Sequence, residues 1–426
     1  MTAEAGKRAE PRHALPAEGT DRERLRRLME EAAADDADWL RRMAAGTNYP
    51  AGEDVLEVSK EAYLRFYSTN GLLPDLFPSL ARFERDVIDY VASLFHGPDA
   101  VGSITSGGSE SILMGVKSAR DRARRLHPEI SEPEMVVPES AHPAFTKGAH
   151  YFGLKLVPVA LGPDHLIDPA TYRAAITDRT VLLVGSAPSL TLGMVDPIAE
   201  LAPLAAERGI GFHVDACVGG FFLPFVERLG DPVPVWDFRV PGVTTISADL
   251  HKFGYAAKGA SVVMSRDRDV FESQPFRFGG PTRPDDWYVT PSMTGTRPGG
   301  SIAAAWAVMN YLGEAGYVDR AERTMRYLRR WWAGIEAIEG LHVMGKPVMS
   351  VFAITSTELD MAAIEAGMQQ RGWLTFMDTH PVPALRFMQS PGHEPYVDRY
   401  LADLRDVAEL VRRGELTAGG ARARYT

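Results

Sequence analysis

A lysine that follows a predicted strand is the residue of this chain best suited to covalent chemistry. Lys252 lies in the segment SADLHKFGYAAKG, directly after His251. A lysine amine forms an imine with an aldehyde when cationic or apolar neighbours keep its pKa low enough for the free amine to exist. Lys258, in the same segment, is a candidate for such a neighbour or for a contact to an anion. Taken alone, a His-Lys pair is more often an ordinary surface feature.

Three motifs that precede Lys252 supply groups that a flat, anionic cofactor needs. The segment ITSGGSE at 104–110 opens a predicted helix, where backbone N–H groups, the helix dipole and the Ser109 hydroxyl can bind a phosphate. His142, in SAHPAF after a predicted strand, carries an aromatic ring that can stack on a cofactor. Asp215, at the strand end in HVDA, can pair with a protonated pyridine nitrogen. Each motif also has a plain structural explanation, as a capped turn, an ordinary histidine or a strand-end cap.

The order of the four motifs predicts pyridoxal 5'-phosphate (PLP), bound through Lys252 as a Schiff base. A phosphate-binding helix start, a ring-stacking histidine, a strand-end aspartate and a strand-end lysine follow one another as fold-type I PLP enzymes require. The 37 positions from Asp215 to Lys252 leave room for one or two further strands. A carboxylate at the pyridine nitrogen keeps the ring cationic, and a cationic ring stabilises a carbanion at the substrate carbon. We therefore expect an enzyme that breaks a bond at that carbon.

The elements around these motifs alternate between buried strands and helices. Short apolar runs with helical patterns between several of them indicate a mostly parallel sheet with helices on both faces. The predicted strands lie at 135–140, 154–160, 180–187, 210–216, 243–249 and 260–265, and the main predicted helices at 20–45, 54–67, 78–95, 109–126, 169–176, 198–207 and 301–338. The expected parts are a flexible tail (1–20), an N-terminal helical segment (21–99), a PLP-binding large domain (100–300), a connecting helix (301–340) and a small C-terminal domain (341–426).

Composition and charge exclude several other classes of protein. The 426 residues carry a formal net charge of −10, whereas a nucleic-acid surface needs a basic face. No apolar run reaches the ~18–20 residues of a membrane span, and the polar N-terminus has no apolar signal core. The single cysteine, Cys217, cannot form an internal disulfide and is expected to be a small core residue. We expect a cytoplasmic protein with no nucleic-acid or membrane partner and no metal site.

The motifs resemble those of the PLP-dependent group II decarboxylase superfamily, and most of all those of its sphingosine-1-phosphate lyase branch. The matching segments, between about Tyr49 and about Leu341, are SGGSESILMGVKSARDRAR, VVPESAHPAFTKGAHYFGLKLVPV, HVDACVGGF, VTTISADLHKFGYAAKGASVV and MTGTRPGGSIAAAWAVM. HKFGYAAKG and TGTRPGG resemble the lyases more than the aromatic or glutamate decarboxylases. The resemblance implies the PLP-dependent transferase fold type I. This α/β fold has a large domain with a mostly parallel seven-stranded sheet and a small C-terminal α/β domain.

The resemblance also implies a homodimer with shared active sites and a role for each matching residue. Lys252 would hold the cofactor and then move protons, Asp215 would pair with the pyridine nitrogen, and His142 would stack on the ring. The other implied roles are phosphate binding by Gly108, Ser109 and His251, phosphate binding from the neighbouring subunit by Gly295 and Thr296, assistance in catalysis by Lys258, and a contribution across the dimer by Tyr49.

Three departures from the lyase pattern bear on the substrate. Lyases have Asn-Pro-Leu-His where this chain has Asn70-Gly71-Leu72-Leu73, so a leucine replaces the histidine expected at the substrate phosphate. Residues 189–192, Ser-Leu-Thr-Leu, are more aliphatic than the matching segment of the lyases. Arg386 lies in the predicted small domain, where related PLP enzymes bind an α-carboxylate, although a surface salt bridge would also explain it. We expect Asn70 and Arg386 to bind the substrate, an amine or amino acid.

Two reactions remain open from the sequence. A carbon–carbon lyase would cleave a β-hydroxy amine by a retro-aldol reaction and release an aldehyde, whereas an amino-acid decarboxylase would release carbon dioxide. A scaffold without activity is the third possibility, and the presence of Lys252, Asp215 and His142 argues against it. The departures predict that sphingosine 1-phosphate is at best a poor substrate and that the preferred substrate is smaller.

Overall fold

The computed structural model describes residues 15–43, 46, 48–379 and 382–418, without the side chains of 283 and 285–287. It divides into two units, one ending at Asp38 and the other beginning at Trp39. The first unit contains α1 (Arg22–Ala33), which Asp21 caps by accepting hydrogen bonds from two backbone N–H groups. The helix ends earlier than residue 45 because aspartates follow Ala33, and negative charge is unfavourable at the carboxyl end of a helix. Residues 1–14 of the expected tail lie outside the described residues.

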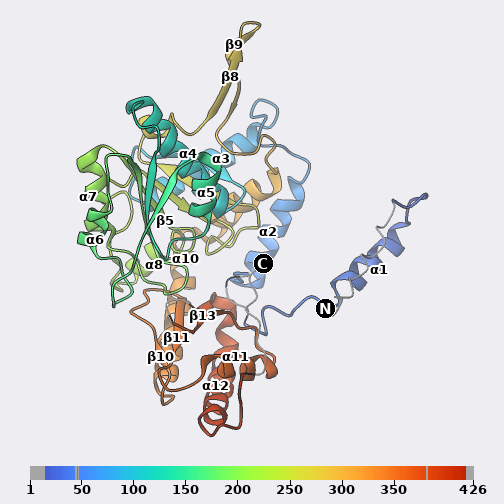
Figure 1. Ribbon diagram of the computed structural model, residues 1–426. Coiled ribbons are helices and arrows are strands. Elements are labelled where there is room, and N and C mark those ends of the chain that lie inside the picture. The colour runs from blue at the N-terminus through green and yellow to red at the C-terminus, as the bar shows by residue number, and fades with distance from the viewer. Residues whose placement is uncertain (1–14, 44–45, 47, 380–381, 419–426) are drawn as a thin grey trace, which may run out of the picture. The chain divides into compact units, whose positions relative to one another are not determined.

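A seven-stranded sheet with the strand order β1-β7-β6-β5-β4-β2-β3 forms the centre of the second unit (Figure 1). Only β7 runs antiparallel to its neighbours. The six predicted strands are present, whereas β1 was missed because its last residues were assigned to a helix start. The strands are β1 (Val101–Thr105), β2 (Glu134–Pro138), β3 (Lys155–Val159), β4 (Thr180–Ser186), β5 (Gly211–Asp215), β6 (Thr245–Ala248) and β7 (Ser261–Ser265).

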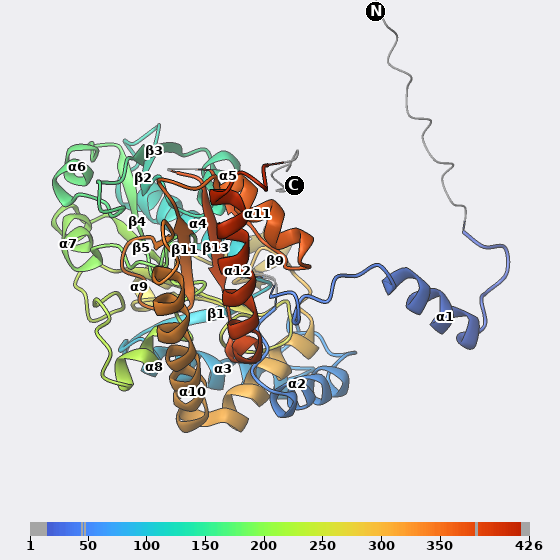
Figure 2. The same cartoon turned by 90° about the horizontal axis from the view of Figure 1, so that it is seen from below.

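Helices cover both faces of this sheet, as Figure 2 shows from below. His213 and Phe212 are neighbours in β5 and therefore point to opposite faces. A Cβ on Gly115 of α4 would lie 2.5 Å from His213, whereas a Cβ on Gly185 would lie 3.1 Å from both Phe212 and Ile198 of α7. The helices of this part are α2 (Glu53–Arg65), α3 (Pro78–Leu94), α4 (Gly108–Leu126), α5 (Ala144–Phe152), α6 (Pro169–Ala174), α7 (Ile198–Arg208), α8 (Leu223–Arg228) and α9 (Arg268–Phe271).

A long helix, α10 (Gly299–Glu336), leads to a four-stranded antiparallel sheet with the order β10-β11-β13-β12. α10 is interrupted at Gly313, whose φ of 54° and ψ of −175° are not helical. Trp331 of α10 packs against Phe352, Phe387 and Tyr400, which joins the helix to the core of this smaller region. The remaining elements are β10 (His342–Val343), β11 (Val351–Thr355), α11 (Met361–Gln370), β12 (Met377–Asp378), β13 (Ala384–Met388), the 3-10 helix η1 (Pro391–Tyr396) and α12 (Val397–Arg412).

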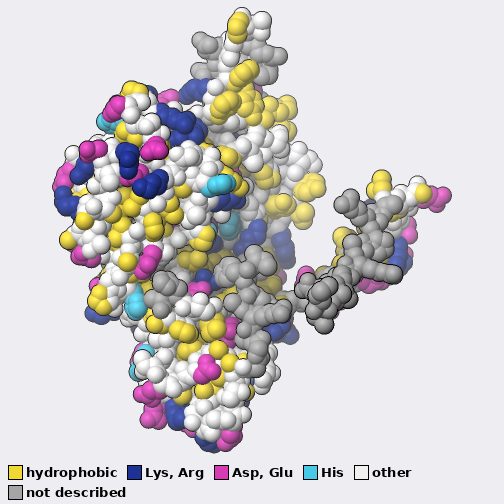
Figure 3. All heavy atoms as spheres, viewed as in Figure 1, with side chains coloured by type: hydrophobic (Ala, Val, Ile, Leu, Met, Phe, Trp, Pro, Cys, Tyr) yellow, Lys and Arg dark blue, Asp and Glu magenta, His cyan; other side chains and the backbone are white. Residues whose placement is uncertain are grey.

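A hairpin of β8 (Phe276–Gly280) and β9 (Arg283–Thr290) was not predicted from the sequence. It carries exposed apolar side chains, among them Phe276 at 55% and Phe278 at 47% exposure. Figure 3 shows apolar side chains at its base and tip. Among the described residues, no helix has both the length and the apolar character needed to cross a membrane.

Candidate active site

The four sequence motifs meet at one edge of the large sheet. β1, β2, β5 and β6 run in the same direction, so their carboxyl ends lie at the same edge. Gly108 follows β1, His142 follows β2, Asp215 ends β5 and Lys252 follows β6. Open α/β sheets bind their ligands at this edge.

Lys252 forms an ion pair with a buried carboxylate. Its Nζ lies 3.0 Å from Oδ2 of Asp249, which is 2% exposed. Burial acts to lower the pKa of Lys252, but the Asp249 carboxylate, together with Tyr49 and Cys217, raises this pKa above its ordinary value. Burial acts to raise the pKa of Asp249, and the charge of Lys252, the largest opposing cause, holds it below its usual value. The expectation that neighbours lower the pKa of Lys252 is therefore wrong, because an anion lies closest to it.

A glycine lets the start of α4 approach this ion pair. A Cβ on Gly108 would lie 2.7 Å from both oxygens of Asp249 and 2.9 Å from the Cys217 sulfur. These distances are too short for any side chain, so the backbone N–H groups of the first helical turn remain accessible beside the pair. Ser109 follows in the same turn. His251 borders the same carboxylate, with its Nε2 3.7 Å from Oδ2 of Asp249.

A buried polar network holds Asp215 in place. The backbone N–H of Cys217 donates to Oδ1 of Asp215 at 3.0 Å, and the Cys217 thiol donates to the Ser247 hydroxyl at 3.3 Å. The Ser247 hydroxyl lies 3.1 Å from Nε2 of His213, and Nδ1 of His213 lies 2.8 Å from the Thr245 hydroxyl. Burial lowers the pKa of His213 to about 4, so its ring is neutral at pH 7. The network fixes Asp215 without adding a charge next to it.

His142 is held with its ring oriented toward these residues. Its Nδ1 accepts a hydrogen bond of 3.1 Å from the Ala144 N–H. Burial lowers the pKa of His142, while the charge of Asp215 acts in the opposite direction and Lys252 adds to the lowering. The ring is therefore neutral at pH 7, as stacking on a cationic pyridine ring requires.

Tyr49 and Lys258 form a second cluster beside Lys252. Lys258 Nζ lies 5.2 Å from the centroid of the Tyr49 ring, and Tyr49 packs edge-on against Phe253 at 5.0 Å. The Tyr49 hydroxyl donates to the Met388 sulfur at 2.7 Å. Burial, together with the charge of Lys252, lowers the pKa of Lys258. Tyr49 was expected to act across a dimer, yet it already contacts Lys258 of its own chain.

Arg386 is a buried cation that faces this site. Arg386 and Met388 are two residues apart in β13, so their side chains point to the same face of the strand. The Arg386 side chain is 8% exposed and lies 3.8 Å from Asp378, whose Oδ2 accepts a hydrogen bond from the Thr191 hydroxyl. The Arg386 charge contributes to the lowered pKa of His142, after burial, Asp215, Lys252 and Asp249. Arg386 thus forms a salt bridge, as the alternative expected, but its side chain is buried and not at the surface.

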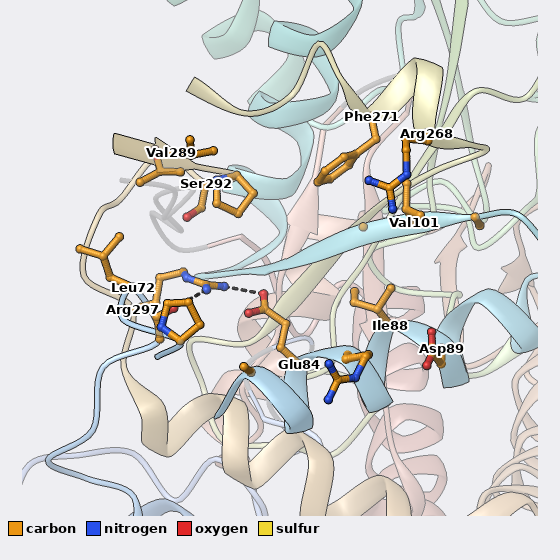
Figure 4. Close-up of a pocket in the computed structure, with 18 of the residues that line it drawn as sticks. Leu72, Glu84, Ile88, Asp89, Val101, Arg268, Phe271, Val289, Ser292 and Arg297 are labelled. Atoms are coloured by element: carbon orange, nitrogen blue, oxygen red, sulfur yellow. Dashed lines mark hydrogen bonds and ion pairs between the residues drawn. The ribbon is translucent and has the colours of Figure 1, made fainter. Parts of the chain in front are cut away.

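Asn70, Gly295 and Thr296 lie in a separate group. Asn70 accepts a hydrogen bond from the Arg297 N–H at 3.2 Å, and its side-chain amide donates to the Thr296 hydroxyl at 3.4 Å. Gly295 lines a pocket of about 450 Å³ together with Leu72 and Arg297, which Figure 4 shows in close-up. Lys252, Asp215 and His142 do not line this pocket. The loop that holds Gly295 and Thr296 nevertheless contacts the start of α4, because the Met293 N–H donates to Oε1 of Glu110 at 2.7 Å.

The aliphatic residues expected near the substrate have different environments. Leu73 is 46% exposed. Leu190 is partly buried against the main core, and Leu192 is 2% exposed in a small cluster with Met194 and Met344. The expectation that Leu192 offers apolar surface to the substrate is therefore wrong, because Leu192 is packed in the protein interior.

The residues at the sheet edge fit PLP. A lysine for the aldehyde, a fixed carboxylate for the ring nitrogen and a glycine at the helix start for the phosphate lie at the same edge of the sheet. Oδ1 of Asp249 is buried and accepts no hydrogen bond from the described residues. Asp249 stood in the quoted motif without a predicted role, and its spacing of three residues from Lys252 was the available signal. Nothing in the sequence indicated that Met388 or Asp378 would lie near the site.

The chain is similar to known PLP proteins along most of its length. The family model described as "Pyridoxal-dependent decarboxylase conserved domain" matches residues 47–354. Sphingosine-1-phosphate lyase 1 of Rattus norvegicus is 42% identical over 365 residues, which cover 84% of this chain and 63% of the rat protein. The L-aspartate/L-glutamate decarboxylase of Pyrococcus horikoshii is 32% identical over 364 residues, which cover 84% of this chain and 91% of that protein.

A solved structure confirms the fold that the sequence predicted. The sphingosine-1-phosphate lyase of Burkholderia pseudomallei superposes with a TM-score of 0.89 at 37% identity, covering 95% of this chain and 94% of that chain. The chain spans less than two thirds of the rat relative, so the comparison with that enzyme concerns only the shared part.

The packing of Cys217 predicts a thiol that does not react in the folded protein. Cys217 is buried, and burial raises the pKa of its thiol well above the ordinary value, whereas the thiolate is the reactive form. A thiol reagent at pH 7.5 is expected to leave the native protein unlabelled and to label one cysteine per chain in denaturant. Rapid stoichiometric labelling of the native protein, measured by absorbance, would contradict the buried position.

Proposed function

The chain belongs to the pyridoxal-dependent decarboxylase family, and we propose that it is a PLP-dependent carbon–carbon lyase that acts on an amine or amino acid. The observation that supports this most directly is the position of Lys252, at the ligand-binding edge of the sheet with Asp215 and His142. The relatives named as sphingosine-1-phosphate lyases support aldehyde-releasing chemistry. We propose a location in the cytoplasm, in line with the absence of a membrane-spanning helix among the described residues.

Each residue at the sheet edge has a proposed task toward the cofactor. Bound PLP withdraws electrons from the carbon next to the substrate nitrogen. Lys252 forms the covalent bond to the cofactor aldehyde. Asp215 has its Oδ1 occupied by the Cys217 N–H, which leaves Oδ2 for the ring nitrogen. His142 stacks on the ring, and the phosphate is held by Gly108, Ser109 and His251.

Lys258 is the proposed proton carrier of the cleavage step. A retro-aldol reaction needs a base that removes the proton of the β-hydroxyl group and an acid that returns a proton to the carbon. The lowered pKa of Lys258, caused by burial and by Lys252, makes its Nζ better suited to both transfers than the Nζ of an exposed lysine. Tyr49 holds Lys258 through its ring and is itself held by Met388.

Amino-acid decarboxylation is the second candidate function. Arg386 is buried and shares a face of β13 with Met388, which contacts Tyr49. A buried arginine is suited to binding a carboxylate. The similarity to an archaeal L-aspartate/L-glutamate decarboxylase is consistent with this reaction. Both candidates use the same cofactor residues and differ in the group that leaves.

A homodimer is the proposed assembly, with Gly295 and Thr296 completing the phosphate site of the neighbouring subunit. Within one chain the loop that holds them contacts Asn70, and its Met293 N–H donates to Oε1 of Glu110 at the start of α4. The segments around this loop expose large apolar side chains, as monomeric proteins rarely do over a wide area. These side chains are Leu73, Leu76, Phe276, Phe278, Val289 and Met293.

The cofactor assignment predicts a covalent adduct on one lysine. Protein incubated with PLP and reduced with borohydride is expected to carry a pyridoxyl group on Lys252, because Lys252 lies beside Asp215 and His142. Tryptic mapping by mass spectrometry measures this. Lys252→Ala should lose turnover and keep its circular dichroism spectrum, whereas an adduct on Lys258 would disprove the assignment.

The substrate proposal predicts that Arg386→Ala selects against substrates with a carboxylate. Loss of a hydrogen bond to a charged group costs ~1.5–3 kcal/mol, or about one to two powers of ten in kcat/KM. The best amino-acid substrate should show this loss, and a phosphorylated amino alcohol should not. Sphingosine 1-phosphate should be cleaved poorly, because Leu73 replaces a histidine. Arg399→Ala, at a side chain 68% exposed, is the matched control. Efficient cleavage of sphingosine 1-phosphate would refute the prediction for that substrate. Unchanged amino-acid kinetics in Arg386→Ala would refute the carboxylate-binding role of Arg386.

The dimer proposal predicts a particle of twice the 46.7 kDa chain mass in light scattering. Phe276→Asp should shift the protein toward monomers and weaken PLP binding, because a charge would be buried in the interface. Leu126→Asp, at a residue 43% exposed outside this surface, should remain dimeric. A fully active 46.7 kDa species would rule the dimer out.

A further inference from the structure

Asp249 is a buried anion to which the proposed cofactor contacts give no task. It is 2% exposed, its Oδ2 pairs with Lys252 at 3.0 Å, and its Oδ1 accepts no hydrogen bond from the described residues. An unpaired buried carboxylate is strongly unfavourable. Lys252 is therefore the main partner that makes this anion tolerable in the interior.

The remaining charges around the pair cannot replace Lys252. His251 Nε2 is the nearest other cationic candidate, at 3.7 Å from Oδ2, and burial lowers its pKa, so that it is mostly neutral at pH 7. Solvent reaches the pair through Lys252, whose side chain is 18% exposed. Four other titratable groups interact electrostatically with Lys252 or Asp249, namely Tyr49, His142, Cys217 and Lys258. Asp215 and Arg386 in turn interact with His142.

We infer that Asp249 controls how the cofactor is loaded, by holding Lys252 as an ammonium ion until PLP arrives. This inference rests on the proposed function of Lys252. An ammonium nitrogen has no lone pair and cannot attack an aldehyde. Loading therefore has to break the ion pair, which makes Asp249 a positioning residue for Lys252 rather than a catalytic residue.

The loading step balances without any further reactant. The ammonium group of Lys252 releases one proton to solvent. Its nitrogen then forms a double bond to the aldehyde carbon of PLP, and the two remaining hydrogens leave with the carbonyl oxygen as one water molecule. The rate of loading is limited by the small fraction of Lys252 that is present as the free amine beside Asp249.

The pH dependence of loading tests this inference. Apoprotein is mixed with PLP at a series of pH values, and the absorbance band of the bound cofactor is followed in time. The wild-type rate should rise steeply with pH. Asp249→Asn removes the anion, and the rise should move to lower pH. If the pKa of Lys252 falls by only one unit, loading in the acidic part of the range becomes about tenfold faster.

Two further variants separate this role from a structural one. Asp249→Glu keeps the charge and should keep the wild-type pH profile. Asp237→Asn removes another carboxylate that is 1% exposed and ion-paired, away from Lys252, so it should lower stability and leave the profile unchanged. An Asp249→Asn profile with the wild-type pH dependence, whether faster or slower overall, overturns the inference. Absence of any borohydride adduct on Lys252 in the wild type would instead overturn the proposed function.

Discussion

The ion pair of Lys252 and Asp249 is the interaction on which the rest of the site depends. Two opposite charges in the interior are stable only at short distance and in fixed geometry. The large sheet provides this geometry, because β6 ends at Ala248 and the turn that follows places Asp249 and Lys252 three residues apart. Gly108 allows α4 to approach without a side chain, and the neutral network of His213, Ser247 and Cys217 adds no charge that would compete with the pair.

Much of this arrangement follows from local sequence. The strands that end at Asp215 and Ala248 are recognisable as short runs between helical patterns, and every residue of both strands is buried. The carboxyl ends of parallel strands must share an edge, so the meeting of Gly108, His142, Asp215 and Lys252 could be predicted. β1 could not be separated from the start of α4, since Val101–Thr105 is short and carries two small residues.

The parts that the sequence did not reveal depend on long-range contacts. The Tyr49 hydroxyl meets the Met388 sulfur across 339 positions of the chain, and neither residue type signals the other. Arg386 is buried because β13 is central in the small sheet, a position that local patterns do not encode. The direction of the pKa shift at Lys252 was predicted with the wrong sign, because the sequence placed a lysine near it but did not show that Asp249 lies closer.

The break in α10 at Gly313 has a consequence for how the segment after Lys252 is connected to the small sheet. The backbone angles of Gly313, φ 54° and ψ −175°, lie in a region that residues with a Cβ rarely adopt, although no neighbouring atom would obstruct a side chain there. After the break, the Tyr317 hydroxyl donates a hydrogen bond to the carbonyl of Gly254, which lies two positions beyond Lys252. Further along the helix, Trp331 packs against Phe387 of β13. The backbone direction at Gly313 thus sets the course of the second half of α10, which contacts both the turn after Lys252 and the core of the four-stranded sheet.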